Sequence, residues 1–416
     1  MPILALALLL AAPAKPLAPG TWAEFRGPDG TGLYAGKPVV AAWGTDTNVA
    51  WKTDLPGVAW SSPVFVAGKL FLTNAVPQGE GAKPDFSLRA LCIDPDTGKV
   101  LWDVELFVEA GAAAPLPHKK NSHASPTPVS DGEALYVHFG HMGTAKLDLA
   151  GKLLWKTQKF AYKPTHGNGG SPILVDGMLV FSCDGQDKQF VVALDPATGE
   201  AKWKTDRNMK AALPFSFATA HAIEVNGRKL IVSPASDFVA AYNASDGAEV
   251  WRVKYPKSGW SVIARPVVAG GLVIVQTGYV NQHLIAIDPN GTGDLTANVK
   301  WTNARLAPNT PTPLVVGDDL YVVSDRGLLS CFEPKTGTVK WSERLAGRGY
   351  SASPVLINGN IYITSEEGIG QVIKPDAAKL VEVSKSDLKE RTFATFVPVD
   401  GALYVRTETK LYKFAK

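Results

Sequence analysis

This chain has few cysteines, little net charge and no long apolar run, and each shortage excludes a class of protein. Its formal net charge is only +3 at pH 7, and no basic run with interleaved aromatic residues is present. The sequence therefore does not indicate nucleic-acid binding. The apolar run Ile3–Ala12 has about ten residues, which is too short to span a bilayer. We expect no nucleic-acid partner and no transmembrane segment.

The three cysteines, Cys92, Cys183 and Cys331, include no adjacent pair. Cys92 and Cys331 stand at the same position of a repeated phrase, in units five steps apart, where other copies have alanine. Residues in units so far apart are too distant for a disulfide. Cys183 falls on a different predicted strand. We predict three reduced thiols that fill small spaces in the core.

The amino terminus has the pattern of a secretory signal peptide, which we assign to residues 1–18. The apolar run is followed by small residues and proline, with cleavage expected at Ala12-Pro13-Ala14 or near Ala18. No cysteine follows the run, which argues against a bacterial lipoprotein anchor. We therefore expect an exported bacterial protein of the periplasm or exterior, with an N-terminal extension over residues 19–47.

A tryptophan returns every 40 to 53 residues and closes the same phrase each time. The phrase is a small residue, an apolar residue, Asp, a two- or three-residue turn, Gly, three residues and Trp; Ala193 to Trp203 is its clearest copy. Asp, Pro and Gly in this order favour a tight turn between two strands. We expect seven tryptophans to dock neighbouring units together: Trp51, Trp102, Trp155, Trp203, Trp251, Trp301 and Trp341.

A second pattern, a hydroxyl residue usually followed by proline and two apolar strands, begins each unit. It occurs at Ser62, Thr127, Ser171, Thr219, Arg265, Thr312, Ser353 and Thr395, with arginine replacing the hydroxyl residue once. Each period therefore holds four short antiparallel strands, which is typical of a β-propeller blade. We predict an all-β, eight-bladed propeller over residues 48–416.

The two patterns are offset, which predicts how the ring closes. Asn48–Leu55 is an outer strand without a preceding blade, and Thr395–Phe414 is a blade without an outer strand. Their pairing would hide the open sheet edge. Val381 stands where we expect the eighth tryptophan, and only the polar stretch Ser384–Arg391 allows a helix.

These repeats resemble the pyrroloquinoline-quinone-type propeller family, whose eight blades carry the phrase Ala-x-Asp-x-x-x-Gly-x-x-x-Trp. The resemblance covers nearly the whole chain from Asn48 onward. Residues Trp22–Gly32 also look like the N-terminal signature of exported bacterial propellers. The family includes non-catalytic members, among them the propeller subunit of the bacterial outer-membrane barrel-assembly machinery, and this chain is similar to that branch.

In catalytic members, the resemblance implies a quinone stacked between a tryptophan and a disulfide of adjacent cysteines, beside a calcium ion held by Glu, Asn and Asp. The cysteine pair is absent here and no such trio stands out. Trp60 or Trp260 would serve either as a stacking face or as rim packing. We therefore expect a protein that binds no cofactor and is not an enzyme. The alternative is a quinoprotein dehydrogenase that uses pyrroloquinoline quinone and calcium.

Five of the seven histidines lie close together in the sequence: His118, His123, His138, His141 and His166. Their spacing matches no known metal motif, and strand alternation would not place His138 and His141 on one face. Polar loop and strand residues are the simpler interpretation, so we predict no metal site.

The connections from each outer strand to the next inner strand should meet around one mouth of the channel. Seven of the eight contribute a cation, which would suit an anionic ligand or an acidic polypeptide. The candidate binding residues are Lys119, Lys120, His123, Lys163, His166, Arg207, Trp260, Arg265, Arg305, Arg348, Tyr350 and Arg391. We expect a monomeric scaffold that binds envelope or secreted polypeptides there.

Overall fold

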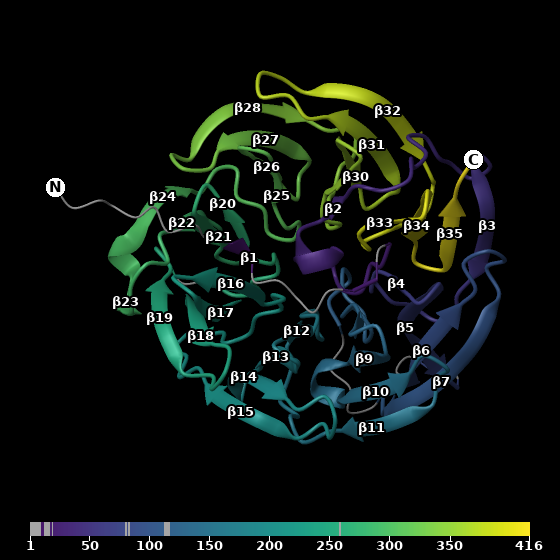
Figure 1. Cartoon of the computed structure of the whole chain (residues 1–416), viewed down its shortest axis with the longest axis horizontal. Helices are drawn as coiled ribbons and strands as arrows, with labels where there is room; N and C mark the ends of the chain where they lie inside the picture. Colours follow the sequence, from purple (N-terminus) through teal and green to yellow (C-terminus); the bar gives the residue numbers. More distant parts are fainter. Residues whose placement is uncertain are drawn as a thin grey trace.

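The computed structural model describes residues 10–11, 17–18, 20–79, 81, 84–111, 117–257 and 259–416. It is a closed ring of eight four-stranded antiparallel sheets around a central axis, as predicted (Figure 1). Most of the predicted signal peptide, residues 1–18, and part of the long connection after Phe107 lie outside the described residues. No helix in the described part of the chain has the length and apolar character needed to cross a bilayer.

The blades are numbered 1 to 8 along the chain, and their strands are given from the axis outward. Blades 1 and 2 comprise β4 (Val64–Val66), β5 (Lys69–Gln78), β6 (Asp85–Ile93) and β7 (Val100–Glu109), then β8 (Val129–Ser130), β9 (Ala134–His138), β10 (Thr144–Asp148) and β11 (Leu153–Thr157). Blades 3 and 4 comprise β12 (Ile173–Val175), β13 (Met178–Asp184), β14 (Gln189–Leu194) and β15 (Ala201–Asp206), then β16 (His221–Val225), β17 (Arg228–Pro234), β18 (Phe238–Asn243) and β19 (Glu249–Lys254).

Blades 5 and 6 comprise β20 (Val267–Ala269), β21 (Leu272–Gln276), β22 (Leu284–Ile287) and β24 (Val299–Asn303), then β25 (Leu314–Val316), β26 (Asp319–Val323), β27 (Leu328–Glu333) and β28 (Thr338–Arg344). Blades 7 and 8 comprise β29 (Val355–Ile357), β30 (Asn360–Thr364), β31 (Ile369–Lys374) and β32 (Val381–Asp387), then β33 (Val397–Val399), β34 (Ala402–Arg406), β35 (Lys410–Phe414) and β3 (Val49–Asp54). The remaining short elements are β1 (Leu10–Ala11), η1 (Pro28–Gly30), β2 (Leu33–Tyr34), η2 (Gly140–Met142), β23 (Gly293–Asp294) and η3 (Thr296–Asn298).

The ring closes through its two ends, as the offset of the sequence patterns predicted. Strand β3 pairs antiparallel with β35, with Lys52 opposite Tyr412. The middle strands of each blade are covered by neighbouring blades on both faces, so they consist of nearly continuous apolar residues; β14, for example, is buried from Phe190 to Leu194.

The hydroxyl residues that begin the blades form a belt of hydrogen bonds around the channel. The backbone N–H at the start of one blade donates to the side-chain oxygen at the start of the next, at 2.9–3.1 Å, in seven of the eight steps. Only the step from Thr219 to Arg265 lacks this bond, because arginine has no hydroxyl. The recurrent Ser or Thr is therefore explained by contact between blades.

Six of the seven expected docking tryptophans donate the indole N–H to a carbonyl of the next blade, and the buried N–H of Trp251 has no such partner. Trp203 of blade 3 donates its Nε1–H to the Ala244 carbonyl of blade 4 at 3.0 Å, and Trp155 of blade 2 donates to the Pro196 carbonyl of blade 3 at 2.9 Å. The glycine of each phrase makes room for the ring of the preceding blade. A Cβ on Gly199 would lie 2.8 Å from Trp155, and the positive φ of 75° also favours glycine there.

Blade 7 departs from the pattern at a different residue from the one we expected. In the other blades the tryptophan faces the residue just before a bulge, and in blade 7 that position pairs Val372 with Ser384, so the prediction of Val381 is wrong. The stretch from Ser384 is also strand rather than helix, since it completes β32. Trp43 takes the place of the missing docking tryptophan between blades 7 and 8. Its ring centroid lies 6.0 Å from that of Tyr362, in a stacked arrangement, and 5.2 Å from that of Phe396, edge to face.

Residues 20–47, which the sequence placed in an N-terminal extension, enter the ring itself. The purple segment around η1 lies at the centre of Figure 1. Trp22 bridges Phe65 in blade 1, the Ala23 carbonyl accepts from the Ser130 N–H in blade 2, and β2 pairs in parallel with β29 in blade 7. The segment thereby contacts blades 1, 2 and 7 from the channel, and it also reaches Arg265 at the start of blade 5, opposite blade 1.

Arg26 anchors this segment at the axis. Its side chain is fully buried, and its five N–H donors are directed at five backbone carbonyls, those of Gly30, Thr31, Thr312, Pro313 and Pro354, at 2.9–3.3 Å. Burial lowers the pKa of Arg26 to about 9, and the nearby Arg265 adds to that effect. The guanidinium is thus held by neutral oxygens of the segment and of blades 6 and 7.

Candidate functional site

The predicted mouth residues lie on the face where outer strands connect to the next inner strands, which we call the loop face. Six of the twelve are exposed, namely Lys119, Lys163, His166, Arg305, Arg348 and Arg391. Lys120, His123 and Trp260 are half-buried, and Arg207, Arg265 and Tyr350 are buried. The loop face therefore presents fewer cations than the sequence suggested.

Arg207 turns inward and joins blades 3 and 4. It donates to the Pro234 carbonyl at 2.9 Å and to two serine hydroxyls, and it lies 3.3 Å from Asp184. Burial raises the pKa of Asp184 to about 7, while Arg207 opposes that rise. This arginine is a structural contact between blades.

Arg265 also points into the channel, where it holds the N-terminal segment. It donates to Glu24 Oε2 and to the Phe25 carbonyl, both at 3.0 Å. Burial raises the pKa of Glu24, and the neighbouring Arg265 works against that rise. The pair therefore links the segment to blade 5, at the step where the hydroxyl belt is broken.

Replacing Arg265 with Ala should lower the free energy of unfolding by about 2–3 kcal/mol at pH 8, because the buried Glu24 carboxylate loses its cation. The loss should be smaller at pH 5. The folded-state pKa of Glu24 is raised, so its protonated form is tolerated at low pH, and stability falls as pH rises through that pKa. Denaturant unfolding at both pH values measures the difference. Combining the change with Glu24→Gln should abolish the pH dependence, and a loss that is equal at both pH values would contradict this account.

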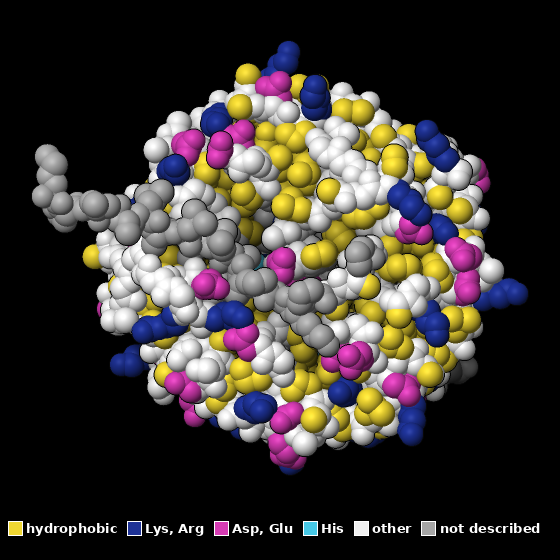
Figure 2. All heavy atoms as spheres, in the orientation of Figure 1, with side chains coloured by type: hydrophobic (Ala, Val, Ile, Leu, Met, Phe, Trp, Pro, Cys, Tyr) yellow, Lys and Arg dark blue, Asp and Glu magenta, His cyan; other side chains and the backbone are white. Residues whose placement is uncertain are grey.

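Two more mouth cations are neutralised by carboxylates. Lys120 lies 2.6 Å from Glu366, and Arg391 lies 2.9 Å from Glu408. Arg391 also covers Trp60 and Phe393, which pack against each other at 4.4 Å. On the face drawn in Figure 2, basic and acidic side chains are likewise interspersed around the rim.

The histidines form contacts with a carboxylate and with one another. Glu109, at the end of β7, lies 2.6 Å from His123 Nδ1 and is hydrogen-bonded to His141 Nε2 at 2.8 Å. Burial would raise the pKa of Glu109, but these two histidines hold it at about 2. His118 and His166 meet edge to face at 5.8 Å on the loop face. No group of three metal-ligating side chains suited to an ion occurs within the described residues.

The side chains present do not match the quinone site that the resemblance implies for catalytic members. Cys92, Cys183 and Cys331 are buried free thiols on separate strands, as predicted, so they offer no adjacent pair. One face of Trp60 is taken by Phe393. The axis of the ring is crossed by the N-terminal segment, with Arg26 at its centre.

An apolar patch on the loop face was missed by sequence reasoning. Leu213, Tyr279 and Val280 are 42%, 54% and 54% exposed, and Trp260 lies beside them in an antiparallel bridge with Tyr279. Backbone bonds from Ser261 to Phe215 and from Tyr279 to Trp260 join the three loops. Val280 has a φ of 74°, which is strained for a β-branched residue. These loops carry no periodic pattern. The only sequence signal for the patch was the pair of large apolar residues Tyr279 and Val280, which follow Gly278 in a loop.

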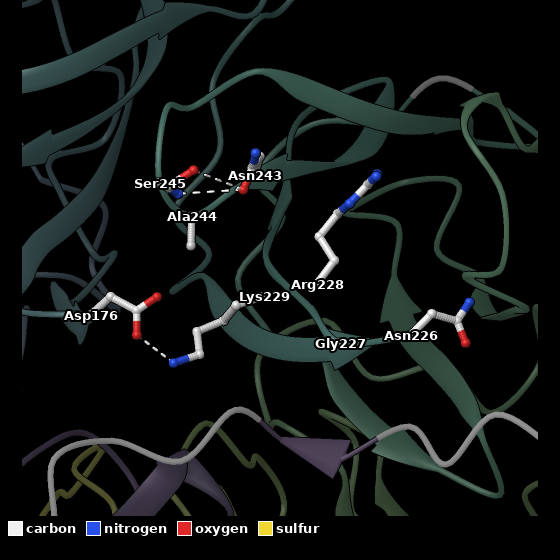
Figure 3. Close-up of a pocket in the computed structure, with 8 residues that line it drawn as sticks. All are labelled: Asp176, Asn226, Gly227, Arg228, Lys229, Asn243, Ala244 and Ser245. Atoms are coloured by element: carbon white, nitrogen blue, oxygen red, sulfur yellow. Dashed lines mark hydrogen bonds and ion pairs between the residues drawn. The ribbon is translucent and has the colours of Figure 1, made fainter.

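A hollow of about 430 Å³ lies at the opposite end of the blades, between turns of blades 3 and 4. Figure 3 shows Asp176 paired with Lys229 there, and Asn243 with Ser245. None of the predicted binding residues lines it. Of the charged residues that line it, Asp176 and Lys229 neutralise each other.

Comparison with known proteins identifies the family. A family profile described as outer membrane protein assembly factor BamB matches residues 17–188 and 187–414. Curated proteins of that name from Shewanella oneidensis and Nitrosomonas eutropha are 26% and 27% identical, over 49% and 58% of this chain. The chain spans 63% and 55% of the length of these two relatives.

Solved structures show the same fold. BamB from Moraxella catarrhalis has a TM-score of 0.56 at 12% identity, covering 88% of this chain and 98% of that one. Quinohemoprotein alcohol dehydrogenase from Comamonas testosteroni has a TM-score of 0.65 at 12% identity, covering 95% and 81%. The family match spans nearly the whole propeller, so the chain belongs to the family of the outer membrane protein assembly factor BamB.

Proposed function

We propose that this protein is an exported, non-catalytic propeller that binds polypeptides on its loop face and serves as a scaffold in the bacterial envelope. The observation that carries the proposal is the exposed apolar patch of Leu213, Tyr279 and Val280, which backbone bonds hold in place. Exposed apolar side chains that cluster on loops mark contact sites for other proteins. Membership of the assembly-factor family supports the same conclusion.

Exposed cations elsewhere on the loop face would help to select the partner. Arg305 follows the outer strand of the same blade as Tyr279, and Arg348 and Lys163 lie in equivalent connections. None of these three forms an ion pair with another described residue. A partner segment with apolar side chains next to carboxylates would therefore fit, and its association would weaken with salt.

The test replaces side chains of the patch without disturbing the ring. Val280→Gly removes an exposed apolar group and relieves the positive φ, so stability should stay the same or rise by up to about 1 kcal/mol. Combined with Tyr279→Ser, it should reduce capture of envelope polypeptides at least about tenfold, since two central contact residues are lost. The measurement is pull-down from envelope extract, with wild type beside the variant at low and high salt.

Two controls distinguish the parts of the proposal. The charge reversals Arg305→Glu and Arg348→Glu should weaken capture at low salt and matter little at high salt, because both side chains are exposed. Lys229→Glu, in the hollow between blades 3 and 4, should leave the partners unchanged. An identical set of captured polypeptides for wild type and the patch variant would refute the proposal, as would calcium-dependent quinone reduction by the wild type.

A further inference from the structure

The channel of this ring is lined by unpaired strand edges. Within its blade each inner strand has a neighbour on its outer side only, so its N–H and C=O groups on the axial side can pair with another stretch of chain, as β16 does with β1 and β29 with β2. The N-terminal segment uses them. The Leu356 N–H donates to the Gly32 carbonyl and the Asn358 N–H to the Tyr34 carbonyl, at 2.8 and 2.9 Å. In blade 1, Trp22 exchanges both backbone bonds with Phe65 at 2.8 Å.

The ring also binds two side chains of the segment at specific places, one through backbone carbonyls and the other through an arginine. Three carbonyls at the starts of blades 6 and 7, those of Thr312, Pro313 and Pro354, receive the guanidinium of Arg26 at 3.1–3.2 Å. Two residues earlier in the segment, the Glu24 carboxylate meets Arg265. Trp22 pairs as a strand residue, and the chain then turns, with the Gly27 N–H donating to the Glu24 carbonyl at 2.9 Å and Arg26 at a positive φ of 69°. The turn is what brings the Glu24 and Arg26 side chains to their two positions on the ring.

The segment is held by the ring without being part of any blade. On its carboxyl side it is joined to the ring by four exposed residues, 35–38, before Trp43 packs between blades 7 and 8. The segment therefore contacts the ring as a separate peptide ligand would, although it belongs to the same chain. Apart from β2 and the bridge at Trp22, it adds no strand to the sheets.

We propose that the channel is a peptide-binding site, now filled by residues 20–36, which accepts in trans a peptide that pairs at an aromatic residue and then turns, and that carries a carboxylate two residues and an arginine four residues after that aromatic residue. The site is distinct from the apolar patch on the loop face and does not depend on the function proposed for that patch. A second copy of this segment is the occupant that the contacts define. The ring supplies Arg265 and a carbonyl cage, which is formed by the carbonyls of Thr312, Pro313 and Pro354. The incoming peptide supplies the arginine and the carboxylate.

The experiment uses the full chain with a protease recognition sequence inserted between Gly36 and Lys37, where both neighbours are exposed. After cleavage of the folded protein, the amino-terminal piece should co-elute with the ring. A fluorescent synthetic peptide of residues 20–36 should then exchange into the ring with a 1:1 limit, followed by anisotropy. The same peptide with Arg26→Ala should bind at least about a hundredfold more weakly, because the three ring carbonyls of the cage lose their donors.

Each outcome decides the proposal. Exchange of the wild-type peptide and failure of the Arg26→Ala peptide support it. A Thr21→Ala peptide serves as the matched control, because the Thr21 hydroxyl bonds to Ala18, which is not part of the peptide. Prompt release of the cleaved piece from a ring that stays folded would overturn it. Equal binding by the wild-type and Arg26→Ala peptides, retention of the piece without any exchange, or unfolding of the ring on cleavage would overturn it too. The loop-face pull-down is unaffected by any of these results, so the two proposals fail separately.

Discussion

Removing the last seven residues, 410–416, should prevent formation of a stable ring. The truncation deletes β35, which pairs with β34 on one side and with β3 on the other. It removes Leu411, Tyr412 and Phe414, which are all at most 2% exposed, and so exposes to solvent the core residues that pack against them. Burial of three such side chains contributes roughly 5–9 kcal/mol, comparable to the entire stability of a typical domain. The expected result is aggregation or loss of the soluble protein.

Size-exclusion chromatography and denaturant unfolding measure this effect. Removing Lys416 alone, an exposed residue beyond β35, is the matched control and should change nothing. Deleting Asn48–Leu55 tests the same seam from the other strand and should also expose an open sheet edge. A truncated protein that elutes and unfolds like the full-length chain would show that β3 and β35 do not close the ring.

Replacing Trp203 with Ala should lower the free energy of unfolding by about 3–5 kcal/mol. The ring of Trp203 is 8% exposed and fills the space between blades 3 and 4, and its indole N–H is bonded to the Ala244 carbonyl. Truncation leaves both a cavity and an unpaired carbonyl. Trp203→Phe should retain part of the stability, because it keeps much of the packing and loses only the bond.

Trp260 provides the comparison, since it is half-buried and belongs to no repeat phrase. Trp260→Ala should cost about 1 kcal/mol or less, as expected for a partly exposed side chain. Chemical denaturation of the three variants against wild type gives these values. Similar losses at Trp203 and Trp260 would contradict the distinction between docking and rim tryptophans.

The repeated features of this fold could be predicted because each blade repeats the same contacts. The phrase ending at Trp203 specifies a turn, a bulge and a docking ring in a short span, so periodicity alone revealed the blade count and the closing strands. Blade 7 was misassigned by three residues at Val381 because its phrase has lost the glycine and tryptophan that fix the register.

The contents of the channel could not be predicted in the same way. Arg26 contacts Pro354, 328 residues away, and no repeat pattern relates the two. The mouth arginines were overestimated for a related reason. A polar loop residue such as Arg207 looks exposed in sequence, whereas its bonds to Ser182 and Pro234 draw it inward. Contacts that occur once in a chain leave no periodic signal.

The one missing bond in the hydroxyl belt gives the ring a preferred place for local opening between two blades. Seven of its eight steps are fastened by a hydroxyl, and the eighth, between blades 4 and 5, is fastened instead through Arg265 and Glu24 to a separate piece of chain. The belt should therefore open most easily at that seam, where the pairing of β19 with β23 still holds the outer side of the two blades together. A circular permutant with new termini in the connection between blades 4 and 5 would place its ends at the step without a belt bond, and it should tolerate that cut better than one made between blades 2 and 3, which would separate two blades joined by that bond.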